Sequence, residues 1–169
     1  KNYLKSKNFS NSKFSHFNIN ERKTIILIST KKNTEPGYQE NLGAEFYNFI
    51  KKNNLQNLSI CSNYIQEKLF CHFIHGIKLK SYTFDLYKTK KNKSATKINV
   101  YLKRTNFSNK YINKLFSIES GTNFARDLVS EPPNVLYPEE YVKRLLKLKK
   151  IGIKVTVYNE LKMKKLGMN

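Results

Sequence analysis

The chain has 169 residues, which is room for one compact domain and part of a second, and 39% of them are hydrophobic. No apolar stretch approaches the ~20 residues that cross a bilayer, which excludes a helical membrane protein. The formal net charge is +20, but only four of the 32 basic residues are arginine, the side chain that binds phosphates and bases through a bidentate fork. We therefore interpret the charge as the Lys- and Asn-rich composition of an AT-rich coding background.

The first half of the chain alternates strand and helix patterns. Residues 1–20 show no periodicity and are predicted to be a disordered leader. The β-branched run at residues 24–29 predicts a strand buried on both faces. The patterns that follow predict a helix at 38–52, a strand at 57–61, a helix at 64–73, a solvated Lys-rich loop at 88–97 and a strand at 98–102. This order predicts an amino-terminal α/β domain over residues 21–108, with at least partly parallel strand pairing.

The second half of the chain is mainly helical. An apolar stripe predicts a long linker helix over residues 109–130, which Pro132 and Pro133 end because each lacks a backbone donor. A new helix is predicted at 137–150, with Pro138 in its first turn, and a strand at 153–158 follows. Residues 131–169 are therefore predicted to begin a second, truncated α/β domain.

The titratable residues offer one weak candidate for a metal site. His72 and His75 lie three residues apart on the predicted helix, and the additional ligand types nearby are Cys61, Cys71 and Glu67. Helical spacing of two histidines does not by itself supply the three or four convergent ligands that zinc requires. The sequence therefore favours partly buried polar side chains over a metal site. Two cysteines without a signal peptide fit a reducing cytoplasm, which is the predicted location.

The remaining candidates for catalysis have structural explanations. Ser130 lacks the strand–turn–helix context of a nucleophile elbow, and Asp85 is interpreted as a capping or surface residue. Glu131, Glu139 and Glu140 are carboxylates of the kind that acid–base chemistry uses. Because the last two occupy the first turn of a predicted helix, the helix dipole explains them. The residues alone thus predict no catalytic, cofactor-binding or metal-binding site.

Two separated motifs resemble the leucyl aminopeptidases, or cytosol aminopeptidases, of the M17 metallopeptidase family. The run Glu131-Pro132-Pro133-Asn134-Val135-Leu136-Tyr137-Pro138-Glu139 is similar to the segment that opens the family's catalytic domain. The second motif, Phe73-Ile74-His75-Gly76 followed by residues 81–91, is similar to the amino-terminal domain of the bacterial members. The likeness extends over about residues 21–169 in register.

The resemblance implies a macro-like amino-terminal domain, a linker helix and a catalytic domain that holds two divalent metal ions, Mn or Zn. It also implies hydrolysis of the amino-terminal peptide bond, peptide substrates and homo-hexamers. The metal-binding and catalytic residues of the family come from later segments, so none is carried onto a position of this chain. The 169 residues alone are thus expected to bind no metal pair and to be inactive.

The alternative to an enzyme portion is a non-catalytic basic module of the same family. Such a module would bind nucleic acid or act in assembly, and its nucleic-acid affinity would fall steeply as salt rises. The net charge of +20 is the feature that keeps this alternative open.

Overall fold

The computed structural model describes residues 13–20, 23–31, 34–62, 66–89, 96–102 and 109–168. The chain divides into two units, Lys1–Gly121 and Thr122–Asn169. The first unit contains, in chain order, β1 (Phe14–Asn20), β2 (Lys23–Ile28), α2 (Pro36–Lys52), β3 (Asn57–Ser62), α3 (Glu67–Ser81), β4 (Lys97–Leu102) and most of α4 (Asn109–Ser130). The second unit contains the end of α4, then α5 (Pro138–Leu146), the 3-10 helix η1 (Lys147–Ile151) and α6 (Glu160–Lys165).

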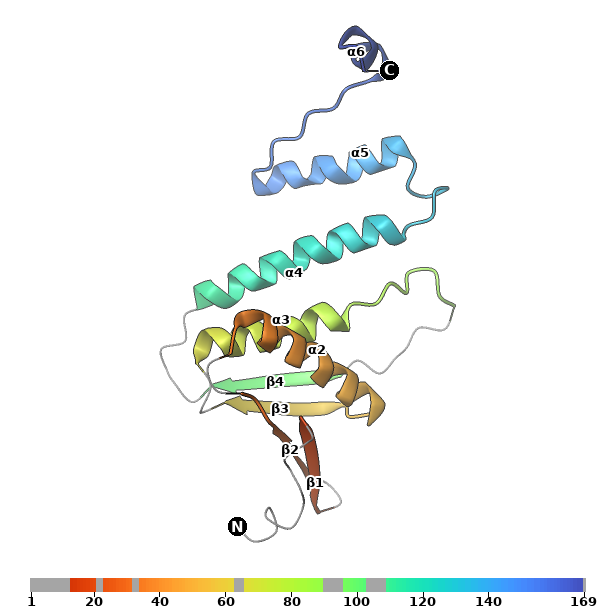
Figure 1. Cartoon of the computed structure of the whole chain (residues 1–169). Helices are drawn as coiled ribbons and strands as arrows, with labels where there is room; N and C mark the ends of the chain where they lie inside the picture. The colour runs from red at the N-terminus through yellow and green to blue at the C-terminus, as the bar shows by residue number, and fades with distance from the viewer. Residues whose placement is uncertain are drawn as a thin grey trace. The chain divides into compact units, whose positions relative to one another are not determined.

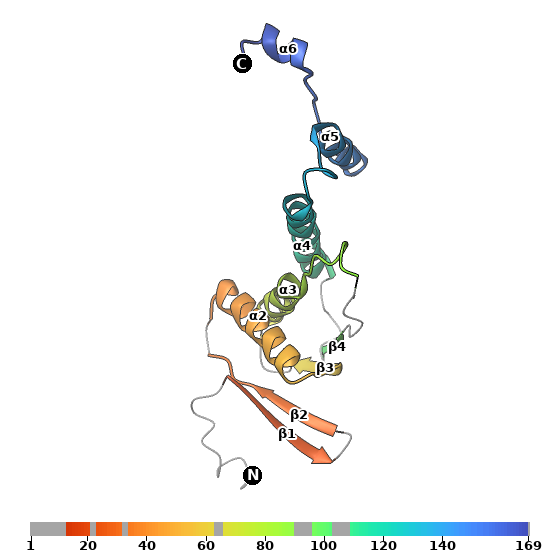
Figure 2. The ribbon, with the colours of Figure 1, turned by 90° about the vertical axis from the view of Figure 1, so that its right-hand side faces the viewer.

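The strands form two small sheets. β1 and β2 pair antiparallel, with Phe14 opposite Ile28, and β3 and β4 pair in parallel with α3 between them in the chain. Figures 1 and 2 show both strand pairs on the same side of α2 and α3. The predicted α/β class, with partly parallel pairing, is confirmed.

The core of the first unit lies where α2 and α3 cross. Apolar residues at helical spacing on α2 pack against the matching stripe of α3 and against β3, and the buried members are Leu42, Phe46, Ile50, Ile60, Phe70, Phe73, Ile74 and Ile77. α3 continues past the predicted end at residue 73 because Ile74 and Ile77 continue its apolar stripe. Residues 63–65, where that helix was predicted to begin, lie outside the described residues.

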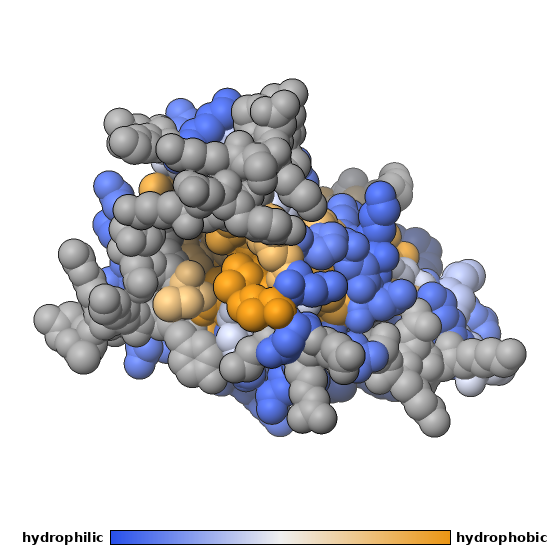
Figure 3. All heavy atoms as spheres, turned by 90° about the horizontal axis from the view of Figure 1, so that it is seen from below, coloured by the Kyte–Doolittle hydropathy of each residue, from blue (hydrophilic) through white to orange (hydrophobic). Residues whose placement is uncertain are grey.

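Two predictions for the amino-terminal segment were wrong. Phe14–Asn20 is not part of a disordered leader but the strand β1, because Phe14 packs on Phe46 and Phe49 of α2 and the strand pairs with β2. β2 is not buried on both faces: Ile26 and Ile28 pack against the core, whereas Ile25 and Leu27 are exposed. Figure 3, which views the molecule from the hairpin side, shows apolar surface there. Residues 1–12 lie outside the described residues.

The second unit differs from its prediction in two places. α5 begins at Pro138 as expected, but it ends at Leu146 and continues as η1, which Gly152 terminates with a φ of 86°. Residues 153–158 form no strand, because no described segment pairs with them and a strand requires a partner for its backbone groups. Within the described residues, no helix is long and apolar enough to cross a membrane.

Candidate functional site

Two glycines let the backbones of α2 and α3 approach closely. A Cβ atom placed on Gly76 would lie 2.0 Å from the backbone oxygen of Glu40, and one placed on Gly43 would lie 2.0 Å from the backbone oxygen of Phe73. Neither position has room for a side chain, so only glycine permits this crossing. The crossing brings Glu40 of α2 beside the carboxyl-terminal half of α3.

Glu40 meets both histidines of α3 at this crossing. Its Oε1 atom lies 2.6 Å from His72 Nδ1 and 3.0 Å from His75 Nδ1. The three side chains form the one His, Cys, Asp or Glu cluster with metal-ligand geometry among the described residues, and their ligand atoms lie within 4.8 Å of one another. Sequence reasoning had considered the two histidines and missed Glu40, which is 32 residues before His72 in the chain.

Tyr111 of α4 extends the cluster on its other side. Its hydroxyl lies 2.7 Å from His72 Nε2, and the two rings meet edge to face at a centroid distance of 5.7 Å. Both ring nitrogens of His72 therefore have partners, and the ring is held with Nδ1 directed at Glu40. Three elements that are distant in sequence thus fix the position of one imidazole.

Burial differs across the cluster. The side chains of His72 and His75 are 12% and 5% exposed, whereas that of Glu40 is 31% exposed. His75 Nε2 is buried and has no hydrogen-bond partner among the described residues. The cluster is therefore closed on the histidine side and open to solvent at the carboxylate.

The two histidines set the charge state of Glu40. Partial burial raises the pKa of this carboxyl, but hydrogen bonds from His72 and His75 outweigh the burial, so the net pKa lies below its ordinary value. Glu40 is therefore a carboxylate at neutral pH, the form that accepts hydrogen bonds and binds cations.

The other ligand types suggested by sequence proximity do not join the cluster. Cys71 lies on α3, where burial and the nearby charge of Glu67 raise the pKa of its thiol to about 11, so the thiol stays protonated at neutral pH. Cys61 is exposed on β3. Neither cysteine nor Glu67 belongs to the group of converging ligand atoms.

Glu131, from the motif that opens the second unit, pairs with an arginine. Its side chain is 3% exposed, and Arg144 Nη1 of α5 lies 2.9 Å from its Oε1. Arg144 Nε also lies 3.5 Å from Glu140, and these carboxylates raise the pKa of the guanidinium. The ion pair ties the proline turn to α5, so Glu131 has a structural role, and Glu139 is exposed.

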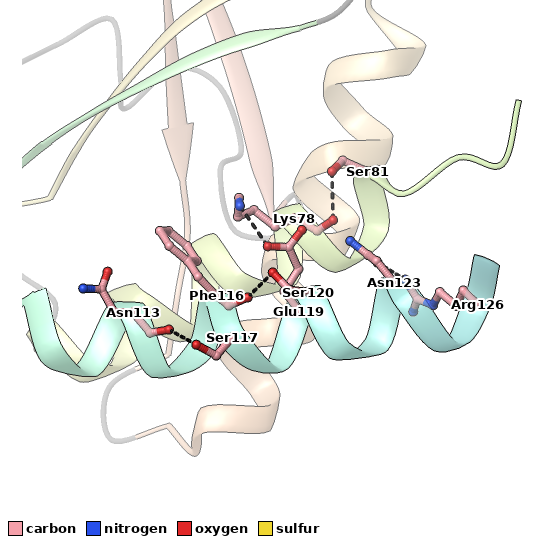
Figure 4. Close-up of polar contacts among 9 residues, drawn as sticks. All are labelled: Lys78, Ser81, Asn113, Phe116, Ser117, Glu119, Ser120, Asn123 and Arg126. Carbon is pink, nitrogen blue, oxygen red and sulfur yellow. Dashed lines mark hydrogen bonds and ion pairs between the residues drawn. The ribbon is translucent and has the colours of Figure 1, made fainter. Parts of the chain in front are cut away.

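A hollow of about 600 Å³, separate from the cluster, lies between α3, β4 and α4. Its walls are mainly apolar and include Ile77, Ile98 and Phe116, with Asp85 and Lys78 among the polar lining. Figure 4 shows Lys78 reaching from α3 to Glu119 of α4 at 2.8 Å; its ammonium also lies 4.2 Å from the centre of the Phe116 ring. Lys78 is therefore paired, and among the described residues no group of three converging His, Cys, Asp or Glu ligands lies in this hollow.

Comparison with known proteins identifies relatives of this chain. It is 42% identical over 97 residues to a probable cytosol aminopeptidase of Bradyrhizobium sp., a match that covers 55% of this chain and 19% of the relative. It is 40% identical over 102 residues to the probable cytosol aminopeptidase of Rhizobium etli, covering 57% of this chain and 20% of that relative. The match thus spans about a fifth of the length of these curated relatives. No family model matches the chain.

Solved structures share the fold of this chain. A mutant of tomato leucine aminopeptidase superposes with a TM-score of 0.74 at 16% identity, covering 91% of this chain and 33% of that one. The bottromycin maturation enzyme BotP superposes with a TM-score of 0.73 at 15% identity, covering 98% and 38%. The predicted resemblance to the cytosol aminopeptidases is confirmed over the 97 and 102 residues that the two bacterial relatives match.

Proposed function

We propose that this chain, which is related to the cytosol aminopeptidases over their amino-terminal part, is the amino-terminal portion of a leucyl aminopeptidase. The complete enzyme removes amino-terminal residues from peptides with the help of two divalent metal ions. Those ions would polarise the scissile carbonyl and generate the attacking hydroxide. The residues that hold them lie outside these 169 residues, and the 169-residue chain alone is inactive.

The exposed apolar surface of the second unit is the observation that supports this proposal. No apolar residue among residues 122–168 is buried. The large hydrophobic residues that this segment exposes are Val129, Tyr137, Tyr141, Ile151, Ile153, Val157, Tyr158, Leu161, Met163, Leu166 and Met168. A segment without a core cannot offset the conformational entropy lost on ordering it. These side chains are those of an unfinished domain, which further polypeptide would cover.

We infer the enzyme's family, location, oligomeric state and metal from its resemblance to the cytosol aminopeptidases. We place the enzyme in the M17 family, in the cytoplasm, as a homo-hexamer with Mn or Zn as its metal. The bacterial relatives are named cytosol aminopeptidases, which supports the cytoplasmic location, and the bottromycin maturation enzyme BotP, whose structure is similar, has been solved in complex with Mn.

The test compares the product of the whole coding sequence with the 169-residue chain. We expect the reading frame to continue past Asn169 and its full product to hydrolyse leucine p-nitroanilide in a reaction that a chelator abolishes. The 169-residue chain, purified in the same way, should show no hydrolysis above background. Chelator-sensitive hydrolysis by the 169-residue chain would contradict the proposal.

The net charge of +20 favours a second candidate, a basic module that binds nucleic acid without catalysis. A stop codon directly after Asn169 would support it. Duplex DNA titrations over a range of salt concentrations separate the two: a module shows sequence preference that persists as affinity falls, whereas background charge shows none.

A further inference from the structure

We propose that Glu40, His72 and His75 form a binding site for one divalent transition-metal ion, and that Zn²⁺ is the ion whose ligand preferences the site meets best. The site is built from two helices of the first unit. It does not depend on the aminopeptidase assignment, and it revises the expectation from sequence that these residues hold no cofactor.

The donor set is that of an open zinc site. Two imidazole nitrogens and one carboxylate oxygen converge within 4.8 Å, and sites with three protein ligands leave a fourth position for water or another ligand. Nitrogen and oxygen donors of this kind favour zinc over magnesium or calcium, which prefer all-oxygen shells. The partial exposure of Glu40 leaves the carboxylate side open to an entering ion.

The distances suit an ion after a small adjustment. Ligand atoms about 2.0–2.1 Å from a tetrahedral zinc lie about 3.3 Å from one another. The two Nδ1–Oε1 distances are 2.6 and 3.0 Å, so an ion requires Glu40 Oε1 to move away from both rings by less than about 1 Å. All three ligand atoms lie within 4.8 Å of one another, so the two imidazole nitrogens need to approach by at most about 1.5 Å. Rotation of the Glu40 side chain, the most exposed of the three, supplies the movement of the carboxylate, and small rotations of the two imidazole rings supply the rest.

The orientation of the histidines is set for coordination through Nδ1. A metal on His72 Nδ1 places the ring proton on Nε2, where it donates to the Tyr111 hydroxyl oxygen 2.7 Å away. Partners of this kind, beyond the ligands themselves, orient histidines in metal sites. His75 is buried with Nε2 lacking a partner among the described residues, so its polar contact is the one that Nδ1 makes at the cluster.

The direct experiment titrates the complete 169-residue chain, prepared without a polyhistidine tag, with Co²⁺ and then displaces the cobalt with Zn²⁺. We expect one Co²⁺ per chain, with the visible absorption of a low-symmetry site, and stoichiometric displacement by Zn²⁺. Glu40→Gln, His72→Asn and His75→Asn should each weaken binding at least about tenfold, and Tyr111→Phe should weaken it about tenfold through His72.

Matched controls use the remaining histidine and the exposed thiol. His16 lies on β1 against the ring of Phe49, and Cys61 lies on β3, both outside the cluster. His16→Asn and Cys61→Ser should leave the affinity unchanged. Binding lost in either control but kept in Glu40→Gln and His75→Asn would overturn the proposal, as would the absence of stoichiometric binding at micromolar ion.

Nitrogen-15 spectra of the unsubstituted chain test the proposal even if one of the variants does not fold. Zn²⁺ should shift the Nδ1 resonances of His72 and His75 in nitrogen-15 spectra and leave His16 unchanged. If saturating Zn²⁺ leaves the His72 and His75 resonances where they are, the cluster is a hydrogen-bond network and the proposal fails.

Discussion

The two units of this chain have similar sequence composition but differ in how much of their apolar surface they bury. Both contain amphipathic helices and both are rich in lysine. In the first unit, α2 and α3 pair their apolar stripes and bury Phe46 and Ile50 almost completely. In the second unit, α5 and α6 bury none of their apolar residues, and Tyr141 and Leu161 are exposed. An amphipathic pattern therefore shows which face of a helix is apolar, but that face becomes buried only when another apolar surface packs against it.

Separating the two units tests this difference most strongly. A chain ending at Gly121 should unfold in one cooperative transition because it retains the whole core. A peptide of residues 122–169 should show no cooperative transition, because it buries none of its apolar side chains. Circular dichroism during thermal melting measures both. A sharp melting transition of the isolated peptide would show that the second unit folds by itself.

Core truncation in the first unit should have the next largest effect. Phe46→Ala removes a side chain that is 2% exposed and packs against Phe14 and Phe73, so we expect a loss of about 3–5 kcal/mol in the free energy of unfolding. Leu161→Ala in the second unit, at a side chain 71% exposed, should change it by less than about 0.5 kcal/mol. Urea denaturation of both variants gives the comparison, and equal losses would contradict it.

Alanine at two glycines should have opposite effects. Gly76→Ala places a methyl group against the backbone of Glu40 and should destabilise the chain by about 1–3 kcal/mol by forcing α2 and α3 apart. Gly121→Ala, in α4 with no atom within 4 Å of the new Cβ, should stabilise it by about 0.5–1 kcal/mol through helix propensity. Thermal melting of each single variant checks the two signs.

The loss of folding stability at acid pH should depend on Glu40. Because the pKa of Glu40 is lower in the folded than in the unfolded chain, its contribution to stability is fully present above the ordinary pKa of a glutamate. That contribution is lost as pH falls further, through the folded-state value. Urea midpoints measured between neutral pH and strong acid should therefore fall less steeply for Glu40→Gln than for the unsubstituted chain. Parallel curves would show that Glu40 has no depressed pKa.

Local patterns predicted most of the helices and strands. The helix at 38–52 is α2 extended by two residues, and the strands at 57–61 and 98–102 are β3 and β4. The helix at 109–130 is α4. The predictions that failed concern segments whose secondary structure depends on whether another strand pairs with them. Phe14–Asn20 has only a weak alternation of apolar and polar residues, yet it forms a strand because it pairs with β2 and packs on α2. Residues 153–158 have the pattern of a strand but pair with no described segment.

The sequence determined the resemblance to the cytosol aminopeptidases, most of the element order and the turn at Glu131, because these depend on residue identity and on spacing over a few residues. Only the tertiary structure decided that Glu40 meets His72 and His75. Neither residue spacing nor charge pattern reveals that meeting, which requires two helices to cross where Gly43 and Gly76 leave no side chain between their backbones. The tertiary structure also showed which apolar helix faces pack against another part of the chain and which do not. Sequence cannot show this, because burial depends on what lies opposite each face.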